Sequence, residues 1–241
     1  IVQGIMGIAE SERGRLVNTL PDPASSSEST DAAFRSAIEA EQTADAQAYV
    51  LAAIERGDGP DDLRPWFTDV VSDHHLSYGH GAIYTQKAFE LLDMIGWERS
   101  ATVLPHLVPT LVYGTREDKL PYMRPFMKAL AGVDLVAVAE VAPADGWADD
   151  GTLLAALLGD RRAAPVEATV AALCSGASVD DVLDVVVQAV SERMLRYDVA
   201  GEFDFADDFG WLDITHGLTY ANAVRWHHAN AVDGGGGGVS S

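Results

Sequence analysis

The feature of this sequence that most limits its fold is a pattern that occurs twice. The segment AAIERGDGPDDL at 52–63 aligns without a gap with AALCSGASVDDV at 171–182. Further along each copy the short motif HGxxY occurs, first at His80–Tyr84 and again at His216–Tyr220. Each copy therefore reads as a helix, a turn with glycine and two aspartates, a second helix, and a third helix that begins at His-Gly. Such repetition is typical of a duplicated structural unit.

The repeat predicts an all-α fold, namely an internally duplicated, bundle-like helical domain in which the two His-Gly helices pair about a pseudo-twofold axis. The repeat halves would span about 44–95 and 163–230 within a single domain over 1–233. His80 and His216 would then approach one another near the axis and face a shared cavity. The alternative is that the glycines and aspartates common at helix ends match by chance in an alanine-rich chain.

Composition and charge exclude several classes of protein. Hydrophobic residues make up 48% of the chain, which is typical of a globular protein. The formal net charge is −21, and a field of that sign repels nucleic acid and anionic membranes, so we expect neither as a partner. The one cysteine, Cys174, excludes an intramolecular disulfide and a cysteine-rich metal site. We expect a cytoplasmic location, because cysteine is so sparse.

Five segments outside the repeat carry predictions of their own. Residues 1–20 have helical spacing of apolar positions, and residues 234–241 read as a glycine-rich linker or tail. Leu104–Tyr113 contains two prolines, so it is either a kinked helix or a buried helix after a loop. Val133–Val141 is predicted to be a helix rather than a strand. Arg116–Pro125 reads as a turn and helix start whose charged side chains lie in solvent.

Histidines are the residues most suited to chemistry in this chain. Helical spacing places His216, Tyr220 and His227 on nearly one face. His75 closes the helix before His80 and reaches the same region if the chain turns between them. Neutral histidine is a common ligand of iron, so His75, His80, His216 and His227 are the predicted metal ligands. The alternative for each is a helix cap or a hydrogen-bonded core residue.

Three further residues are predicted to be catalytic. Tyr84 and Tyr220 each lie one helical turn after the histidine of a motif, and Arg225 is a cation on the last helix. An arginine there could hold a carboxylate or an oxyanion. The structural alternative for the tyrosines is a core aromatic ring with its hydroxyl bonded at the rim.

The two motif helices, GHGAIYTQKAFELLD and DITHGLTYANAVRWHH, resemble the questin oxidase-like family. That family's helical proteins carry one histidine-centred helix early and another late, and the resemblance does not extend to the connecting segments. It implies oxidation of a polyketide or a similar hydrophobic aromatic, with an oxygen insertion of the Baeyer–Villiger type. By matching position it carries over only His80 and His216. The additional histidines depart from the family pattern, which favours a metal over cofactor-free chemistry.

We therefore expect an oxidoreductase, specifically an oxygenase, in which histidine-bound iron activates dioxygen beside a hydrophobic small molecule. A separate redox domain beyond the glycine-rich segment would supply electrons, and a homodimer is left open. Two other functions fit the same residues. One is a non-enzymatic helical binding or dimerisation module, and the other is a cofactor-free enzyme in which a histidine acts as the base.

Overall fold

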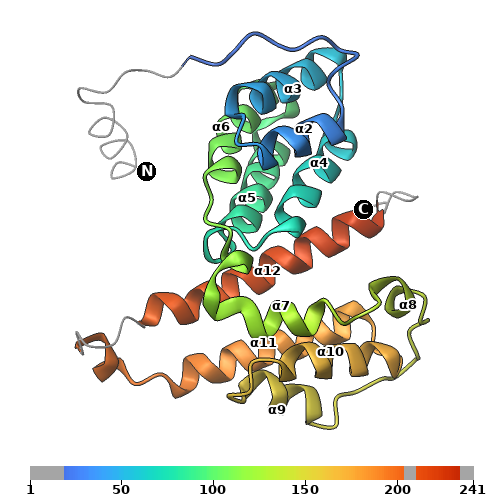
Figure 1. The fold of residues 1–241 in the computed structure, drawn as a ribbon, viewed down its shortest axis with the longest axis vertical. Coiled ribbons are helices and arrows are strands. Elements are labelled where there is room, and N and C mark those ends of the chain that lie inside the picture. The colour runs from blue at the N-terminus through green and yellow to red at the C-terminus, as the bar shows by residue number, and fades with distance from the viewer. Residues whose placement is uncertain (1–18, 204–209, 234–241) are drawn as a thin grey trace.

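The computed structural model describes residues 19–203 and 210–233, and every regular element within those ranges is a helix (Figure 1). This confirms the all-α prediction. The one β-type pairing in the described chain is an isolated bridge between Leu76 and Arg116. None of the helices described is long and apolar enough to span a bilayer. The α-helices are α2 (Asp31–Glu39), α3 (Thr43–Arg56), α4 (Pro60–Asp73), α5 (His80–Ile95), α6 (Ser100–Val112), α7 (Arg124–Leu130), α8 (Leu135–Ala139), α9 (Thr152–Leu158), α10 (Ala164–Cys174), α11 (Val179–Arg196) and α12 (Trp211–Asp233).

Short 3₁₀ helices connect several of these elements. They lie at the sharp turns between longer helices, where a tighter winding is common. They are η1 (Ser77–Gly79), η2 (Trp97–Arg99), η3 (Glu117–Lys119), η4 (Pro121–Met123) and η5 (Val199–Phe203).

Helices α2 to α6 form a first lobe around the larger of two hydrophobic cores. Its centre is a row of fully buried aromatic rings, in which Phe67 lies 5.1 Å from Phe34 and 5.6 Å from Phe89 between ring centroids. The spacing of apolar residues along α4 gives it a continuous buried face, since residues three and four apart share one side of a helix. That face consists of Leu63, Trp66, Phe67, Val70 and Val71.

Helix α6 is continuous although it contains Pro105 and Pro109. Pro109 has no N–H to donate to the carbonyl of Pro105 four residues earlier, and that carbonyl would otherwise be left without its helical partner. The side chain of Gln47 on α3 donates to it from 2.9 Å. A neighbouring helix thus replaces the missing backbone bond, and the segment forms a regular helix rather than a loop followed by a helix.

Helices α9, α10 and α11 form a second lobe with a smaller core. Ser178 caps α11, and it does so reciprocally with Asp181: the Ser178 hydroxyl accepts from the Asp181 N–H at 3.0 Å, and the Asp181 carboxylate accepts from the Ser178 N–H at 2.8 Å. The buried side chains of this core are Leu153, Ala172, Ala177, Val182 and Val185.

Helix α12 joins the two lobes by packing on both α5 and α11. Figure 1 shows it running between the lobes as the long C-terminal helix. Ala223 is fully buried in the first core. On another side of the helix, the Gly217 backbone comes so near α11 that an added Cβ would lie 3.3 Å from Val190. Small residues on α12 therefore let the two lobes approach one another closely.

The turns of the two sequence repeats are built alike. Gly57 and Gly176 both have a φ of 99°, the left-handed conformation that glycine adopts most readily. Asp62 accepts from the Gly59 N–H at 2.9 Å, just as Asp181 does from Ser178. The similarity holds for this turn and cap, and the duplication of whole units stays a prediction.

Three segment predictions have different outcomes. Val133–Val141 contains α8, so the choice of helix over strand is confirmed. The predicted helix over residues 1–20 falls almost wholly outside the described residues, which begin at 19. The predicted linker at 234–241 also lies outside them.

Candidate functional site

A pocket lies where the end of α4, the short helix α7 and the middle of α12 meet. Its volume is 340 Å³, which is at the lower end of the range of small-molecule sites, roughly 300–1,000 Å³. Apolar side chains form one wall and polar side chains form the other. The combination of an apolar body with a few convergent polar groups is the usual composition of a ligand site.

Helix α7 provides the apolar wall. The lining residues Met123, Phe126, Met127 and Leu130 follow the spacing i, i+3, i+4 and i+7, so they share one side of the helix. Val224 on α12 also lines the cavity. Methionine side chains are flexible and polarizable, so this wall can adapt to apolar ligands of different shape.

The polar wall depends on pairing between two connecting segments. The Ser77 N–H donates to the Thr115 carbonyl at 2.8 Å, and the Glu117 N–H donates to the His75 carbonyl at 2.9 Å. These bonds flank the bridge between Leu76 and Arg116. The segment after α4 is thereby fixed at a point where the neighbouring His74 and His75 line the pocket.

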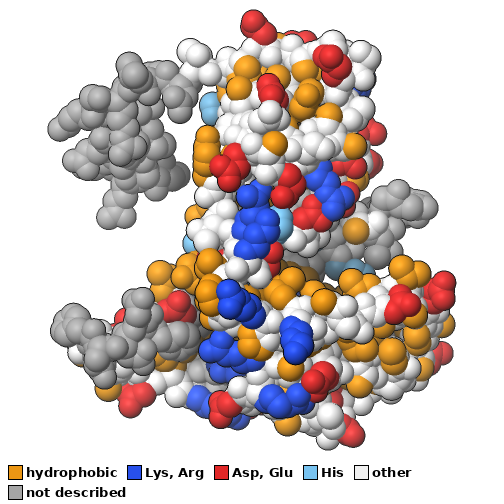
Figure 2. All heavy atoms as spheres, in the orientation of Figure 1, with side chains coloured by type: hydrophobic (Ala, Val, Ile, Leu, Met, Phe, Trp, Pro, Cys, Tyr) orange, Lys and Arg blue, Asp and Glu red, His pale blue; other side chains and the backbone are white. Residues whose placement is uncertain are grey.

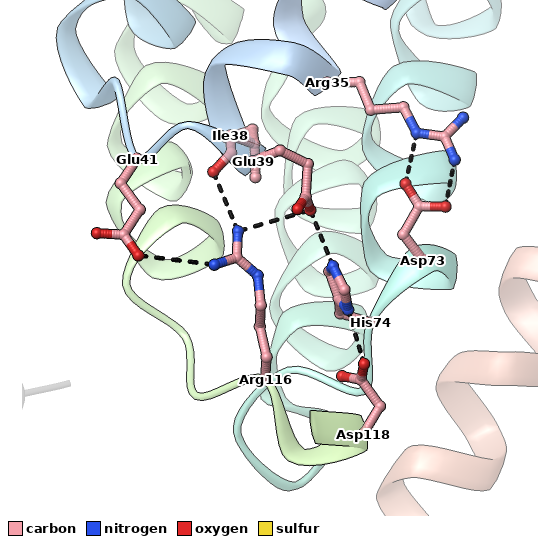
Figure 3. Close-up of polar contacts among 8 residues, drawn as sticks. All are labelled: Arg35, Ile38, Glu39, Glu41, Asp73, His74, Arg116 and Asp118. Carbon is pink, nitrogen blue, oxygen red and sulfur yellow. Dashed lines mark hydrogen bonds and ion pairs between the residues drawn. The ribbon is translucent and has the colours of Figure 1, made fainter. Parts of the chain in front are cut away.

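His74 is held on both sides by carboxylates (Figure 3). Its Nε2 lies 2.9 Å from Glu39 and its Nδ1 lies 2.9 Å from Asp118. Arg116 continues the network through contacts of 3.5 Å to Glu39 and 3.6 Å to Glu41. His74 thereby ties the pocket wall to α2 through Glu39 and to η3 through Asp118.

His75 and Tyr220 form the part of the polar wall whose polar atoms make no hydrogen bond to the residues that the structure describes. Their rings meet edge to face, with centroids 4.9 Å apart. Within the described chain neither ring nitrogen of His75, nor the Tyr220 hydroxyl, has a hydrogen-bond partner. Burial lowers the pKa of His75, and the negative charges of Glu117 and Asp118 partly oppose that effect. Burial also raises the pKa of the Tyr220 hydroxyl, so the phenol stays neutral.

Glu117 is buried and Asp118 is partly buried, which corrects the expectation that the charged side chains of this segment lie in solvent. Glu117 is 1% exposed and accepts a hydrogen bond from the Tyr122 hydroxyl. The side chain of Asp118 is 11% exposed, and its Oδ1 is a buried atom that has no hydrogen-bond partner among the described residues. The prediction was wrong because consecutive charged residues usually lie on a protein surface. The isolated bridge, which no local pattern predicts, turns these side chains inward.

His227 lines the pocket, but both of its ring nitrogens are already used. Its Nε2 lies 3.1 Å from the Ala82 carbonyl and its Nδ1 lies 2.9 Å from the Thr68 hydroxyl. A neutral ring satisfies both partners if Nε2–H donates and Nδ1 accepts. Burial lowers the pKa of His227 and keeps the ring neutral. His227 is therefore a hydrogen-bonded core histidine that would lose a bond on binding metal.

The structure brings His80 and His216 together. Their Nε2 atoms are 2.9 Å apart, and the rings are nearly perpendicular with centroids 4.8 Å apart. The Tyr84 ring stacks on His80 at 5.2 Å. Neither histidine nor Tyr84 lines the pocket of His75. Arg225 is also elsewhere, where it is exposed and forms an ion pair with Asp184 on α11 at 2.8 Å.

The proposed four-histidine metal site therefore needs correction. His216 and His227 are eleven residues apart on one continuous helix, and at 1.5 Å per residue their backbones are separated by about 16 Å. One ion cannot bind both. Among the residues that the structure describes, no group of three or more histidine, cysteine, aspartate or glutamate side chains is placed to hold a metal ion.

Comparison of the chain with protein-family models, with curated proteins and with solved structures finds no match.

Proposed function

We propose that the chain is an enzyme that binds an apolar small molecule in the pocket between α7 and α12, and that His75 removes a proton from it. One observation supports this most strongly. Beside its apolar wall the cavity is lined by His75 and Tyr220, whose ring nitrogens and hydroxyl form no hydrogen bond with any other described residue. Polar groups in such surroundings normally form hydrogen bonds, so a ligand that supplies the missing partners would bind with both affinity and orientation.

The electrostatics of the site suit His75 to act as a base. Burial lowers its pKa, so the ring is neutral near pH 7 and one nitrogen can accept a proton. Once the ring is protonated, the nearby charges of Glu117 and Asp118 stabilise the imidazolium. The Tyr220 hydroxyl can donate to the oxygen from which the proton leaves. Phenols and other acidic hydroxyl compounds are the substrates that match these groups.

The prediction of an oxygenase is compatible with this first step, because a deprotonated aromatic is more electron-rich and more easily oxidised. The resemblance to the questin oxidase-like family points to the same class of substrate. An electron-supplying redox domain and a homodimer stay predictions. Internal duplication is also proposed, supported by the matched turns at Gly57 and Gly176.

Binding of a simple phenol tests whether the pocket is a ligand site. We expect 2-naphthol to bind the wild-type protein with a Kd on the order of 0.1 mM, given its few heavy atoms. Leu130→Trp places a larger ring in the cavity and is expected to weaken binding at least about tenfold, the loss of roughly 1.4 kcal/mol. Saturation-transfer NMR and calorimetry measure both values.

The matched control is Leu135→Trp on α8, where the same substitution occurs at a side chain that is 59% exposed and outside the pocket. Its Kd should equal that of the wild type. Equal weakening in both variants, or no binding of any apolar phenol by the wild type, would refute the assignment of the pocket.

A second candidate function, iron chemistry, is favoured by the pair of His80 and His216. The two Nε2 atoms are 2.9 Å apart, and an ion bound by both would replace the hydrogen bond between them, with water or substrate completing its coordination. Anaerobic titration with Fe(II) should then show one bound ion per chain, lost in the double variant His80→Ala and His216→Ala. No stoichiometric binding, or binding unaffected by the double substitution, would exclude this candidate.

A further inference from the structure

Cations that lack an ion pair gather on one side of this acidic protein. Across residues 19–203 and 210–233, most lysines and arginines lie within 4.0 Å of a carboxylate. The exceptions are all exposed and all belong to the region around α7 and the second lobe. They are Lys119, Arg124, Lys128, Arg162 and Arg193, and together they are called the cationic face.

Contacts between elements hold the cationic face together. Arg162 donates to the Tyr122 carbonyl at 2.7 Å, which ties the segment before α10 to η4, and α7 packs on α10. Arg193 donates to the Leu157 carbonyl at 2.9 Å beside the same segment. Figure 2, viewed as in Figure 1, shows lysine and arginine side chains gathered over this region. Since the chain has a net charge of −21, a group of exposed cations that pair with no described carboxylate is distinctive.

Helix α7 links this face to the pocket. Its inward residues, among them Phe126 and Leu130, line the cavity. Arg124 and Lys128 are four residues apart and therefore share a side of the same helix, where both are exposed. A molecule that binds the cationic face would thus rest on the helix that forms the apolar wall of the pocket.

We infer that the cationic face is a docking surface for an acidic protein. The contact is local, because at physiological salt charges act over a Debye length of about 8 Å. A compact acidic partner can place its carboxylates within that distance while its remaining surface stays away from the acidic lobes. Nucleic acid and anionic membranes are extended, so the field of the whole chain repels them.

Charge reversal on α7 tests this surface. The probe is a glutamate-rich peptide containing leucine and phenylalanine, with its glutamine counterpart as the uncharged reference. We expect the acidic peptide to bind the full chain, to weaken as salt is raised, and to bind Arg124→Glu plus Lys128→Glu about tenfold less tightly or worse. Hydrogen exchange should show protection of α7 by the peptide and none of α2. Circular dichroism of the variant verifies that these exposed substitutions leave the fold unchanged.

The control variant is Lys87→Glu plus Arg99→Glu, which changes the net charge by the same amount on the first lobe. It should retain the wild-type affinity. Equal weakening in the two double variants would show that only total charge matters and would overturn the inference. So would tighter binding of duplex DNA or phosphatidylserine vesicles than of the acidic peptide, or equal binding of the glutamine peptide.

Discussion

Replacing Gly79 with alanine is expected to lower the free energy of unfolding by about 2–4 kcal/mol, the sum of left-handed backbone strain and overpacking. Gly79 has a φ of 90°, and an added Cβ would lie 2.3 Å from Cδ2 of Tyr220 and 2.8 Å from its Cγ. The methyl group would therefore displace a ring that lines the pocket and that attaches α12 to the first lobe. Urea denaturation of the wild type and the variant measures the difference.

Gly57→Ala separates backbone strain from overpacking. Gly57 has a φ of 99°, and in the described part of the chain no heavy atom beyond its own neighbours lies within 4 Å of an added Cβ. Only the backbone strain should then appear, a loss of about 1 kcal/mol. If the free energy of unfolding falls equally in the two variants, the added methyl group at position 79 does not crowd the Tyr220 ring. Phenol binding offers a second readout, because Gly79→Ala should also weaken it whereas Gly57→Ala should not.

His75→Gln is expected to reduce turnover of the natural substrate by about 10²–10⁴-fold, the usual contribution of a general base. Glutamine keeps a polar side chain of similar reach but cannot accept the proton. Because the loss concerns the transition state, kcat should fall with little change in KM. His106→Gln is the control, because His106 is exposed on α6 and should leave kcat unchanged.

The pH dependence of kcat/KM also tests whether His75 is the general base. Burial lowers the pKa of His75, so its neutral form persists below the ordinary histidine value of about 6.5. Activity should therefore be constant near neutrality and should fall only as the pH drops through that lowered value. The acidic limb should disappear from the residual activity of His75→Gln. An acidic limb that persists unchanged would assign the base to another group.

The sequence predicted helices well because their signals are local. The glycines and aspartates of the two turns, the apolar face of α4 and the spacing along α12 all act within a few residues. The meeting of His80 and His216 followed from the position of the two HGxxY motifs. Spacing also predicted that His216, Tyr220 and His227 lie on nearly one face of the last helix. The structure adds that Tyr220 faces Gly79 and that His227 binds Ala82.

The pocket was only partly predictable. Its polar wall depends on the bridge between Leu76 and Arg116, which joins segments forty residues apart through backbone hydrogen bonds. Asp118 and the inward side of α7 could not be assigned without that contact. Helical angle alone also grouped His216 with His227 as ligands, although distance along the axis separates them. Arg225 was assigned a catalytic role because it is a cation on α12, whereas it pairs with Asp184 at the surface.

The ¹⁵N chemical shifts of the His75 ring, recorded in the free protein and with saturating 2-naphthol near pH 7, test whether His75 is the base that meets the ligand. We expect a neutral ring in the free protein. Its unprotonated nitrogen should move upfield when the naphthol hydroxyl donates to it, and the shifts of His106 should stay constant. A His75 ring that is already protonated at pH 7, or one whose shifts do not change when the ligand is bound, would show that His75 is not the base in this pocket.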